Sequence, residues 1–481
     1  MVDAGLPIWN PAELPKSASM FEFAHTNSLP ILSAPMRRLE QDPLRELLAL
    51  ERQFGEVCCW DDDPYRLWFV FGPKLNRVVL SETETYHSCF CPIRGPRNSS
   101  QRRLTGGLLN MNGDEHRRHR RLLSAPFQRP AIAGYYAAVV ALAQEMLDGW
   151  SVGQVRDVRE DMDQFMLKIT SAMLFGVEDS ELANRTGTLL DEFLTRNNEV
   201  GLAAVGAQSQ RGESYSELLT SAELVEEQVR RVIDWRRRSG SRGNDLLSLL
   251  LEANDAEGSI SDADLVGHTA LLFGAAKSTT SFTLTWTLLL VALHAAVSRE
   301  LERESRAVLD GRTPTLDDPD RLPYLDCVIK ESMRILPASA YVQRVTSRPT
   351  SLGPFSLDRG ATVVFSQFVS HRIPQQFPEP DRFQPERWQN WKPAAYAYIP
   401  FGMGARLCLG TTLAMTILKF VLPMIWQRFS LEVEDNSQID MQVVATMLSP
   451  AGPVPMRLHP PNRAPSASRV RGAFPEYVAL A

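Results

Sequence analysis

Residues 265–293 form the longest apolar stretch of this 481-residue chain, with the sequence LVGHTALLFGAAKSTTSFTLTWTLLLVAL. This length exceeds the roughly 20 residues that a membrane-spanning helix needs. Its middle, however, carries Lys277 among hydroxyl side chains, those of Ser278, Thr279, Thr280, Ser281, Thr283 and Thr285. Polar groups at this density are costly in lipid but are tolerated in a helix buried inside a large protein. The stretch therefore predicts a long central helix with a polar interruption near its middle, and a capping box of Ser261 and Asp264 at its start.

Apolar residues at helical spacing dominate the chain up to residue 336 and return after residue 408. The expected helices cover 42–55, 131–150, 155–176, 180–200, 215–238, 243–253, 261–308, 321–336 and 409–429. Segments in which apolar and polar residues alternate predict strands at 67–73, 341–347 and 361–369. A helix-rich chain with a small strand-rich region late in the sequence is typical of a mainly α fold of the α+β class.

The two ends of the chain have a different composition. Residues 1–45 are rich in proline and predict an irregular segment, and residues 461–481 predict a flexible, solvated tail rich in Pro, Ser, Arg and Ala. The first residues contain no basic segment followed by an apolar stretch of signal-peptide length. We therefore expect a cytoplasmic protein without a membrane anchor.

The charge balance argues against one class of function. The 51 Lys and Arg residues against 57 Asp and Glu residues give a formal net charge of −6 at pH 7. A protein that binds nucleic acid by neutralising phosphates needs a basic surface, and the basic run here is the short one around residues 117–121. We expect no nucleic-acid partner.

Six cysteines in a chain of this length are too few for a disulfide scaffold, and a reducing cytoplasm keeps them as thiols. The pairs Cys58–Cys59 and Cys89–Cys91 have no second Cys or His pair at the spacing of a zinc site. We expect these cysteines to be small core or surface residues rather than metal ligands.

Cys408 has a different setting, in the segment PFGMGARLCLG at residues 400–410. Gly404 and Gly410 allow backbone or a flat cofactor to approach closely. At the start of the predicted helix, backbone N–H groups and the helix dipole favour a thiolate. Arg406 supplies a cation that suits either this thiolate or an acidic group on a cofactor. The segment therefore presents a cysteine, favoured as the thiolate, beside a site for a flat cofactor.

This segment resembles the haem-binding loop of cytochrome P450 enzymes, and it matches the pattern F-x-x-G-x-R-x-C-x-G at Phe401, Gly404, Arg406, Cys408 and Gly410. The resemblance implies that haem b is the cofactor and that Cys408 is the proximal ligand of its iron. It also implies that further contacts with the cofactor come from the neighbouring loop residues Phe401, Gly402, Arg406 and Gly410.

Two further motifs follow in the order of the family. KESMRILP at 330–337 resembles its E-x-x-R helix, in which Glu331 and Arg334 share one helix face and can pair. FPEPDRFQPERW at 377–388 resembles the meander that follows, where Arg387 completes a Glu–Arg–Arg network. The resemblance implies a structural role for this network, which fixes the conformation of the core on the haem side.

The segment EHRRHRRLLSAPF at 115–127 resembles the helix that lies over the haem edge in the family. His116 and Arg120 match the pair that binds one propionate, and their i, i+4 spacing places them on one helix face. Arg344 and Arg406 resemble the other arginines that bind propionates.

The other basic residues of this segment have two open interpretations. Arg117, Arg118 and Arg121 form either a solvated face or the basic footprint on which a small acidic redox protein docks. His119 is expected to point elsewhere, and His371 in SHRIP is expected to pack in the core rather than to bind metal.

The central helix departs from the family at its oxygen-handling motif. The best match to A/G-G-x-D/E-T-T is AAKSTT, which places Ala275 and Ala276 beside the cofactor. Thr279 supplies the alcohol, but Ser278 replaces the carboxylate that usually helps to relay protons. Lys277 is expected to extend away from the pocket to water. The reaction therefore stays open between a monooxygenase with another relay, a peroxide-using enzyme, and an isomerase or dehydratase that needs no reductant.

Together these resemblances imply one cytochrome P450 catalytic domain over residues 1–460, folded as a helical triangular prism with a small β-rich region. The expected reaction transfers one oxygen atom from O2 to an apolar small molecule of secondary metabolism, such as a terpenoid, fatty-acyl or polyketide-type compound. Electrons are expected to reach this monomeric enzyme from NAD(P)H through a reductase and a ferredoxin or flavodoxin. The expected substrate pocket includes Leu272, Phe273 and Leu448 in the turn at 447–450. The alternative of another class is a haem sensor without turnover.

Overall fold

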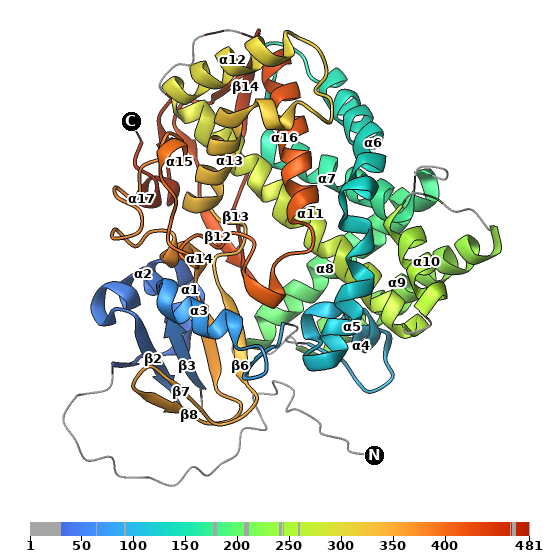
Figure 1. Cartoon of the computed structure of the whole chain (residues 1–481), viewed down its shortest axis with the longest axis vertical. Coiled ribbons are helices and arrows are strands. Elements are labelled where there is room, and N and C mark those ends of the chain that lie inside the picture. The colour runs from blue at the N-terminus through green and yellow to red at the C-terminus, as the bar shows by residue number, and fades with distance from the viewer. Residues whose placement is uncertain are drawn as a thin grey trace.

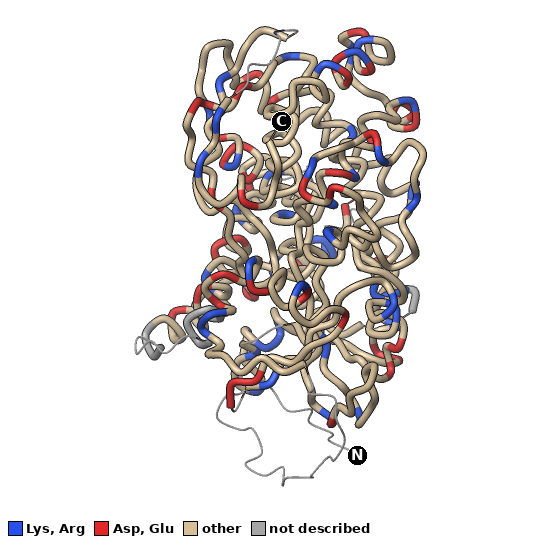
Figure 2. Tube along the Cα trace, turned by 90° about the vertical axis from the view of Figure 1, so that its left-hand side faces the viewer, with Lys and Arg blue, Asp and Glu red and all other residues tan. Residues whose placement is uncertain are grey.

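The computed structural model describes residues 30–480 except 64, 91–92, 177–179, 206–210, 240–242, 244, 258–259, 462 and 464–467. A large helical region surrounds α11 (Asp262–Leu293) and α16 (Thr411–Arg428), and a smaller strand-rich region lies at one end of it (Figure 1). Basic and acidic residues are interleaved over the molecule rather than separated by sign (Figure 2). The architecture is the mainly α fold with a small sheet region that the sequence predicts.

The helices in the middle of the chain lie close to their predicted ranges. Besides α11 and α16, the helices are α1 (Met36–Gln41), α2 (Pro43–Phe54), α3 (Pro73–Ser81), α4 (Ser100–Leu104), α5 (Gly113–Leu123), α6 (Arg129–Asp148), α7 (Val158–Phe175), α8 (Ser180–Val205), α9 (Arg211–Ser239), α10 (Leu246–Glu257), α12 (Ala295–Leu309), α13 (Pro323–Ile335), α14 (Gln367–Ser370), α15 (Arg387–Asn390) and α17 (Phe474–Tyr477).

The largest sheet among the described residues has six strands in the order β1-β2-β3-β9-β6-β4. It joins segments that are far apart in the sequence, because β3 pairs with β9 in parallel, with Leu67 opposite Thr362. The strands are β1 (Ile31–Ser33), β2 (Val57–Asp62), β3 (Tyr65–Val70), β4 (Tyr86–Ser88), β5 (Val155–Asp157), β6 (Val342–Thr346), β7 (Thr350–Leu352), β8 (Phe355–Leu357), β9 (Thr362–Phe365), β10 (Ser430–Val433), β11 (Ser437–Gln438), β12 (Met441–Val444), β13 (Met447–Pro450), β14 (Pro455–His459) and β15 (Val470–Arg471).

Helix α11 is the central element, and it begins with the predicted capping box of Ser261 and Asp264. The prediction of a single helix over 261–308 is wrong, because the chain breaks at His294 and turns by 108° into α12. His294 leaves the helical conformation at φ −123° and ψ 84°, and its Nδ1 atom lies 2.7 Å from the Leu290 carbonyl oxygen. Apolar residues continue on both sides of this break, so periodicity alone does not indicate it.

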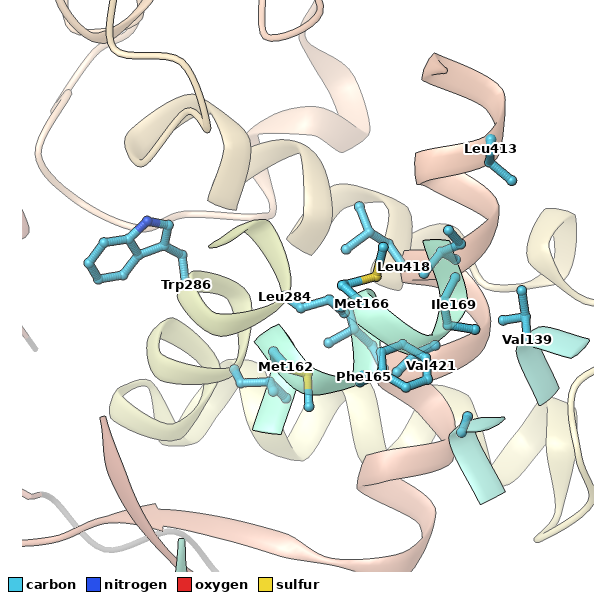
Figure 3. Close-up of a cluster of buried hydrophobic side chains, with 14 of the residues drawn as sticks. Val139, Met162, Phe165, Met166, Ile169, Leu284, Trp286, Leu413, Leu418 and Val421 are labelled. Atoms are coloured by element: carbon cyan, nitrogen blue, oxygen red, sulfur yellow. The ribbon is translucent and has the colours of Figure 1, made fainter. Parts of the chain in front are cut away.

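The main core forms where α6, α7, α11 and α16 pack together. Figure 3 shows its interdigitating side chains, which include Val139, Met162, Phe165, Met166, Ile169, Leu284, Leu413, Leu418 and Val421. Each large side chain buried in this way contributes about 1.5–3 kcal/mol to stability. By length and composition alone, α6 is the one described helix that could cross a membrane, and here it packs against α7 and α16.

Both predictions for the chain ends need correction. Residues 30–45 are not irregular, because they form β1, α1 and the start of α2, whereas residues 1–29 lie outside the described part. The tail predicted as flexible over 461–481 instead supplies β15 and α17. Phe474 is fully buried there and stacks on Trp286 of α11 with ring centroids 6.1 Å apart. Its few apolar residues therefore outweigh the polar composition of the segment.

Candidate active site

Two glycines shape the loop that presents Cys408. Gly402 and Gly404 adopt positive φ angles of 70° and 69°, which other residues rarely adopt. A Cβ atom on Gly404 would lie 3.0 Å from the carbonyl oxygen of Leu80, so the loop packs tightly against the end of α3. The Cys408 N–H donates to the Phe401 carbonyl over 2.9 Å and closes the loop just before α16.

Cys408 is an exposed residue. Its thiol is nevertheless largely surrounded by protein atoms, and this desolvation raises the pKa of the thiol. Hydrogen bonds from Gly410 and Thr411 and the charge of Arg120 oppose this rise in pKa and favour the thiolate. Because a bound metal ion deprotonates a coordinating thiol, the raised pKa is compatible with a ligand role.

Four basic side chains that the sequence predicts at one site lie close together, and the charge of one of them, Arg120, acts on Cys408. We call this set the cation cluster, and its members are His116, Arg120, Arg344 and Arg406. They come from α5, from β6 and from the cysteine loop, which are far apart in the sequence. In the described part of the chain, the three arginines donate only to neutral acceptors: the carbonyl oxygens of Leu407, Gln343, Leu108 and Met111 and the side-chain oxygen of Asn112.

The electrostatics of the cation cluster indicate a missing negative charge. Burial, followed by the charges of neighbouring arginines, lowers the pKa of His116 to about 4 and the pKa values of Arg344 and Arg406 to about 10. Among the residues that the structure describes, no carboxylate pairs with any member. Buried cations without an anion are costly. The cluster therefore fits a ligand that brings its own negative charge, as the propionate groups of haem do.

One face of helix α11 is accessible in its middle, and we call it the open face. Ala275 is exposed although it lies in the middle of this otherwise buried helix, and Ala276, Ser278 and Thr279 are half-buried. The Thr279 hydroxyl donates to the Ala275 carbonyl over 2.7 Å, so this oxygen is held in place. Small side chains at 275 and 276 leave room for a flat group to approach the helix.

The prediction that Lys277 extends to water is wrong. Its side chain is buried, and its Nζ atom lies 2.7 Å from Asp163 Oδ2 of α7 and 2.8 Å from Asp191 Oδ1 of α8. Two carboxylates offset the cost of removing the ammonium group from water, which is why the lysine is stable inside the protein.

The three residues of the predicted Glu–Arg–Arg network meet in the structure. Glu331 Oε1 accepts from Arg334 Nη2 and from Arg387 Nε, at 2.9 Å in both cases, and Glu331 and Arg334 are fully buried. Trp388 Nε1 donates to the other carboxylate oxygen over 2.9 Å. Arg334 also donates to the backbone carbonyls of His371, Pro380 and Arg382. The network therefore joins α13 to the segment that leads to the cysteine loop.

The residues predicted for a substrate pocket are only partly placed at a cavity. Leu272 is half-buried and, with Ala276, lines a small apolar cavity of about 30 Å³ between α7, α10 and α16. Phe273 is fully buried and faces Gly187 of α8, where an added Cβ atom would lie 3.2 Å from its ring. The prediction that Phe273 lines the pocket is therefore wrong.

Leu448 is also fully buried, so its predicted place in the pocket is wrong as well. The turn expected at 447–450 falls earlier, at Ala445 and Thr446, because residues 447–450 form β13. The Trp286 Nε1 atom of α11 donates to the Leu448 carbonyl over 3.2 Å. The tip of the β12–β13 hairpin packs against the segment before β6, because the Ala340 N–H donates to the Thr446 carbonyl over 2.8 Å and the Tyr341 hydroxyl donates to the Ala445 carbonyl over 3.0 Å.

Sequence reasoning missed one contact between α5 and α11. His119 points away from the cation cluster, as expected, but its Nδ1 atom lies 2.8 Å from His268 Nε2 in a buried pair. The two residues are too far apart in the chain for any spacing to reveal this contact.

His371 packs in the core as predicted, where its Nε2 atom accepts from the Ile399 N–H. Cys58 and Cys59 are also buried core residues, whereas Cys91 lies outside the described residues.

The comparison with protein families shows the family of the chain. The model of the family described as Cytochrome P450 matches residues 26–454. The chain belongs to the cytochrome P450 family. This P450 is similar to cyclooctat-9-en-7-ol 5-monooxygenase of Streptomyces melanosporofaciens, with 28% identity over 445 residues, 90% of this chain and 94% of the relative. It is also similar to pentalenene oxygenase of Streptomyces avermitilis, with 28% identity over 392 residues, 79% of this chain and 84% of the relative.

A solved P450 structure shows the same fold. Retinoic acid bound cyanobacterial CYP120A1 superimposes with a TM-score of 0.74, covering 85% of this chain and 93% of that chain at 21% identity. The protein is thus a cytochrome P450 monooxygenase, an oxidoreductase. Membership of the family implies haem iron as the cofactor. The exposed Cys408 thiol, the unpaired cation cluster and the small residues of α11 fit this group.

Proposed function

We propose that this P450 holds haem b between α11 and α16, with Cys408 as the thiolate ligand. The cation cluster would bind the propionates, and Phe401, Gly402, Gly410, Ala275 and Ala276 would contact the ring. The single observation that carries this proposal is the absence of any carboxylate partner for the cation cluster in the described part of the chain, next to an exposed thiol. Bound haem supplies the oxygen activation, which electron density from a thiolate ligand promotes.

The protein's own residues would prepare this site for oxygen transfer. The Gly410 N–H interacts with the Cys408 sulfur, and the Thr411 hydroxyl donates to the Cys408 carbonyl oxygen over 2.9 Å, which fixes the position of the ligand. Thr279 holds its hydroxyl against the Ala275 carbonyl, where it can hand a proton to a group on the open face of α11. Ser278 extends this relay by one hydroxyl, because no acid precedes Thr279. The Glu331 network would hold the segment that leads to the cysteine loop in a fixed position relative to α13.

The substrate that we propose is an apolar terpenoid, hydroxylated or epoxidised by one oxygen atom from O2. Terpenoid-oxidising relatives at about 28% identity support this class over fatty-acyl and polyketide-type compounds. Apolar side chains near the cysteine loop and α11 add support, since Leu271, Leu272 and Leu409 are only partly buried and pack against one small apolar cluster.

Electrons would come from NAD(P)H through a reductase and a small acidic ferredoxin or flavodoxin. The exposed arginines of α5, Arg117, Arg118 and Arg121, provide the docking surface in this proposal. They lie on the outer side of the helix whose inner side carries His116 and Arg120. A partner bound there would therefore lie close to the cofactor edge, which favours electron transfer.

The test is the absorption spectrum of the purified, reduced protein under carbon monoxide, followed by turnover of a terpenoid and fatty-acid panel. The red-shifted Soret band of thiolate-ligated haem is expected, with product formed only when NADPH, reductase and ferredoxin are all present. A band of neutral-ligand haem would remove Cys408 from the proposal. Product from peroxide or from an oxygenated substrate alone would favour the reductant-independent reaction that Ser278 leaves open.

A further inference from the structure

The side of α11 opposite the open face carries the buried ion cluster of Lys277, Asp163 and Asp191, which we call the lysine triad. Lys277 Nζ lies 2.7 Å from one carboxylate of α7 and 2.8 Å from one of α8. The lysine side chain is 6% exposed, and the aspartates are 31% and 27% exposed. One ammonium group therefore connects three helices from inside the protein.

The helices approach one another closely around this triad. A Cβ atom on Gly274 of α11 would lie 2.8 Å from Leu194 Cδ1 of α8. A Cβ atom on Gly187 of α8 would lie 1.9 Å from Ser171 Oγ of α7. Glycine at both positions permits the approach, and the lysine triad fixes it with charge. A displacement of α8 would therefore disturb its contacts with α11.

The position of Lys277 along α11 relates the triad to the proposed oxygen site. Lys277 lies two residues from both Ala275 and Thr279, so helical geometry directs its side chain to roughly the opposite side of the helix. Thr279 and Thr283 donate their hydroxyls to carbonyls four residues earlier. Such bonds weaken and bend helices. This segment consequently depends on outside contacts to hold its shape.

We propose that Lys277, held by Asp163 and Asp191, is a positioning residue for the turn of α11 that presents Ser278 and Thr279 to the cofactor. The triad clamps this turn from behind, against α7 and α8. It thereby fixes the distance between the Thr279 hydroxyl and a group on the open face, which decides whether a proton arrives productively. This inference rests on the proposed function of Thr279, but the contact between the helices does not.

The first measurement compares Lys277→Met with Lys277→Arg in the holoenzyme. Lys277→Met should retain the thiolate carbon monoxide spectrum but form about one third or less of the parent's product per NADPH, with a matching rise in peroxide, because small misplacements of reacting groups cost large factors. Lys277→Arg, which can still reach both aspartates, should restore most of the coupling. Coupling equal to the parent in Lys277→Met would overturn the proposal.

Two further variants separate positioning from stability. Lys277→Met leaves two carboxylates without a cation, so it lowers the melting temperature for that reason alone. The triple variant Asp163→Asn, Asp191→Asn, Lys277→Met removes all three charges and should recover the melting temperature while coupling stays low. Recovery of coupling together with the melting temperature would reduce the triad to a stabilising role and contradict the proposal.

Hydrogen–deuterium exchange tests the triad independently of any reaction. Asp191→Asn should increase exchange in peptides that cover Gly187–Leu194 of α8 and Ala275–Thr279 of α11, with the thiolate spectrum unchanged. Unchanged exchange in both peptides would overturn the clamp. If the exchange changes as expected but Thr279→Ala has no effect on coupling, the proposed role of Thr279 fails and the clamp stands.

Discussion

Arg406 donates to the carbonyl oxygen of Met111 over 2.6 Å and thereby ties the cysteine loop to the start of α5. The same guanidinium donates to the Asn112 side chain over 2.7 Å. These bonds bring His116 and Arg120 of α5 to the side of the loop that presents Cys408. The geometry of the cation cluster therefore depends on Arg406, together with Arg120, which donates to the Leu407 carbonyl of the same loop over 2.6 Å.

Replacing Arg406 by Met should weaken haem binding. A hydrogen bond between charged groups contributes about 1.5–3 kcal/mol, which corresponds to a loss of roughly ten- to a hundredfold in affinity. The measurement is the rate of haem transfer from the holoenzyme to an excess of apomyoglobin. Arg117→Gln, on the exposed side of α5, is the matched control and should release haem at the parent's rate. Equal retention in Arg406→Met and Arg117→Gln would show that the cluster does not hold the cofactor.

Cys408→Ser should abolish the thiolate signature. A neutral hydroxyl at this position supplies no thiolate to the iron, so the reduced carbon monoxide complex should show the spectrum of neutral-ligand haem. Cys327→Ser, at a buried position on α13, serves as the control and should keep the parent spectrum. Retention of the thiolate band in Cys408→Ser would assign the ligand to another cysteine.

Glu331→Gln should destabilise the fold by about 3 kcal/mol or more, because it leaves the buried guanidinium of Arg334 without its carboxylate. Urea unfolding at constant protein concentration measures this change. Glu379→Gln is the matched control, since Glu379 pairs with Arg382 at the surface, and it should change stability by less than about 1 kcal/mol. Similar losses in both variants would argue against a special role for the buried network.

Thr279→Ala should raise the share of electrons lost as peroxide, since it removes the hydroxyl on the open face of α11. Thr283→Ala is the matched control, because Thr283 makes the same type of bond to a carbonyl four residues earlier but is buried. Peroxide and product are quantified in the same reaction. An equal change in both variants would trace the effect to the helix rather than to a proton relay.

Ser278→Asp should increase coupling, which is the share of electrons that ends in product rather than in peroxide. It restores a carboxylate next to Thr279, which can hold a proton where a serine hydroxyl cannot hold charge. We expect less peroxide per NADPH and a turnover rate that depends more strongly on pH. Unchanged coupling and an unchanged pH profile would make the replacement of the usual acid neutral in this enzyme.

Acidification should destabilise the protein through His268. Burial first, and the nearby His119 second, lower the pKa of His268 to about 4. An unfolded histidine titrates near 6.5, so between pH 6.5 and 4 the unfolded state binds more protons and stability falls as the pH falls. The full effect is about 3 kcal/mol. His268→Gln should flatten this part of the stability curve measured by urea unfolding, and an identical slope would contradict the assignment.

Local patterns in the sequence predicted the helices and the site motifs because both depend on neighbouring residues. The spacing in 401–410 is enough to identify the cysteine loop, and the i, i+4 pair His116 and Arg120 lies on one face of α5 as expected. The buried state of Lys277 could not be predicted, since its partners lie 114 and 86 residues earlier in the chain.

The errors have a common physical origin in tertiary contacts. Phe273 faces α8 because Gly187 gives it space there, and no feature of residues 265–293 indicates which side of the helix meets α8. The break at His294 depends on how α12 packs, so the apolar pattern runs through it unchanged. Residues 470–478 look like a solvated tail by composition, but their few apolar side chains find a place in the core.

The burial of Phe474 and Tyr477 has a consequence for how the protein forms during synthesis. Phe474 stacks on Trp286, and Tyr477 contacts Phe368 edge to face with ring centroids 5.6 Å apart. Trp286 and Phe368 leave the ribosome well before the residues that cover them. Part of the central core of the nascent chain therefore stays uncovered until late in translation. A tag or fusion placed soon after Tyr477 would disturb this last step of folding.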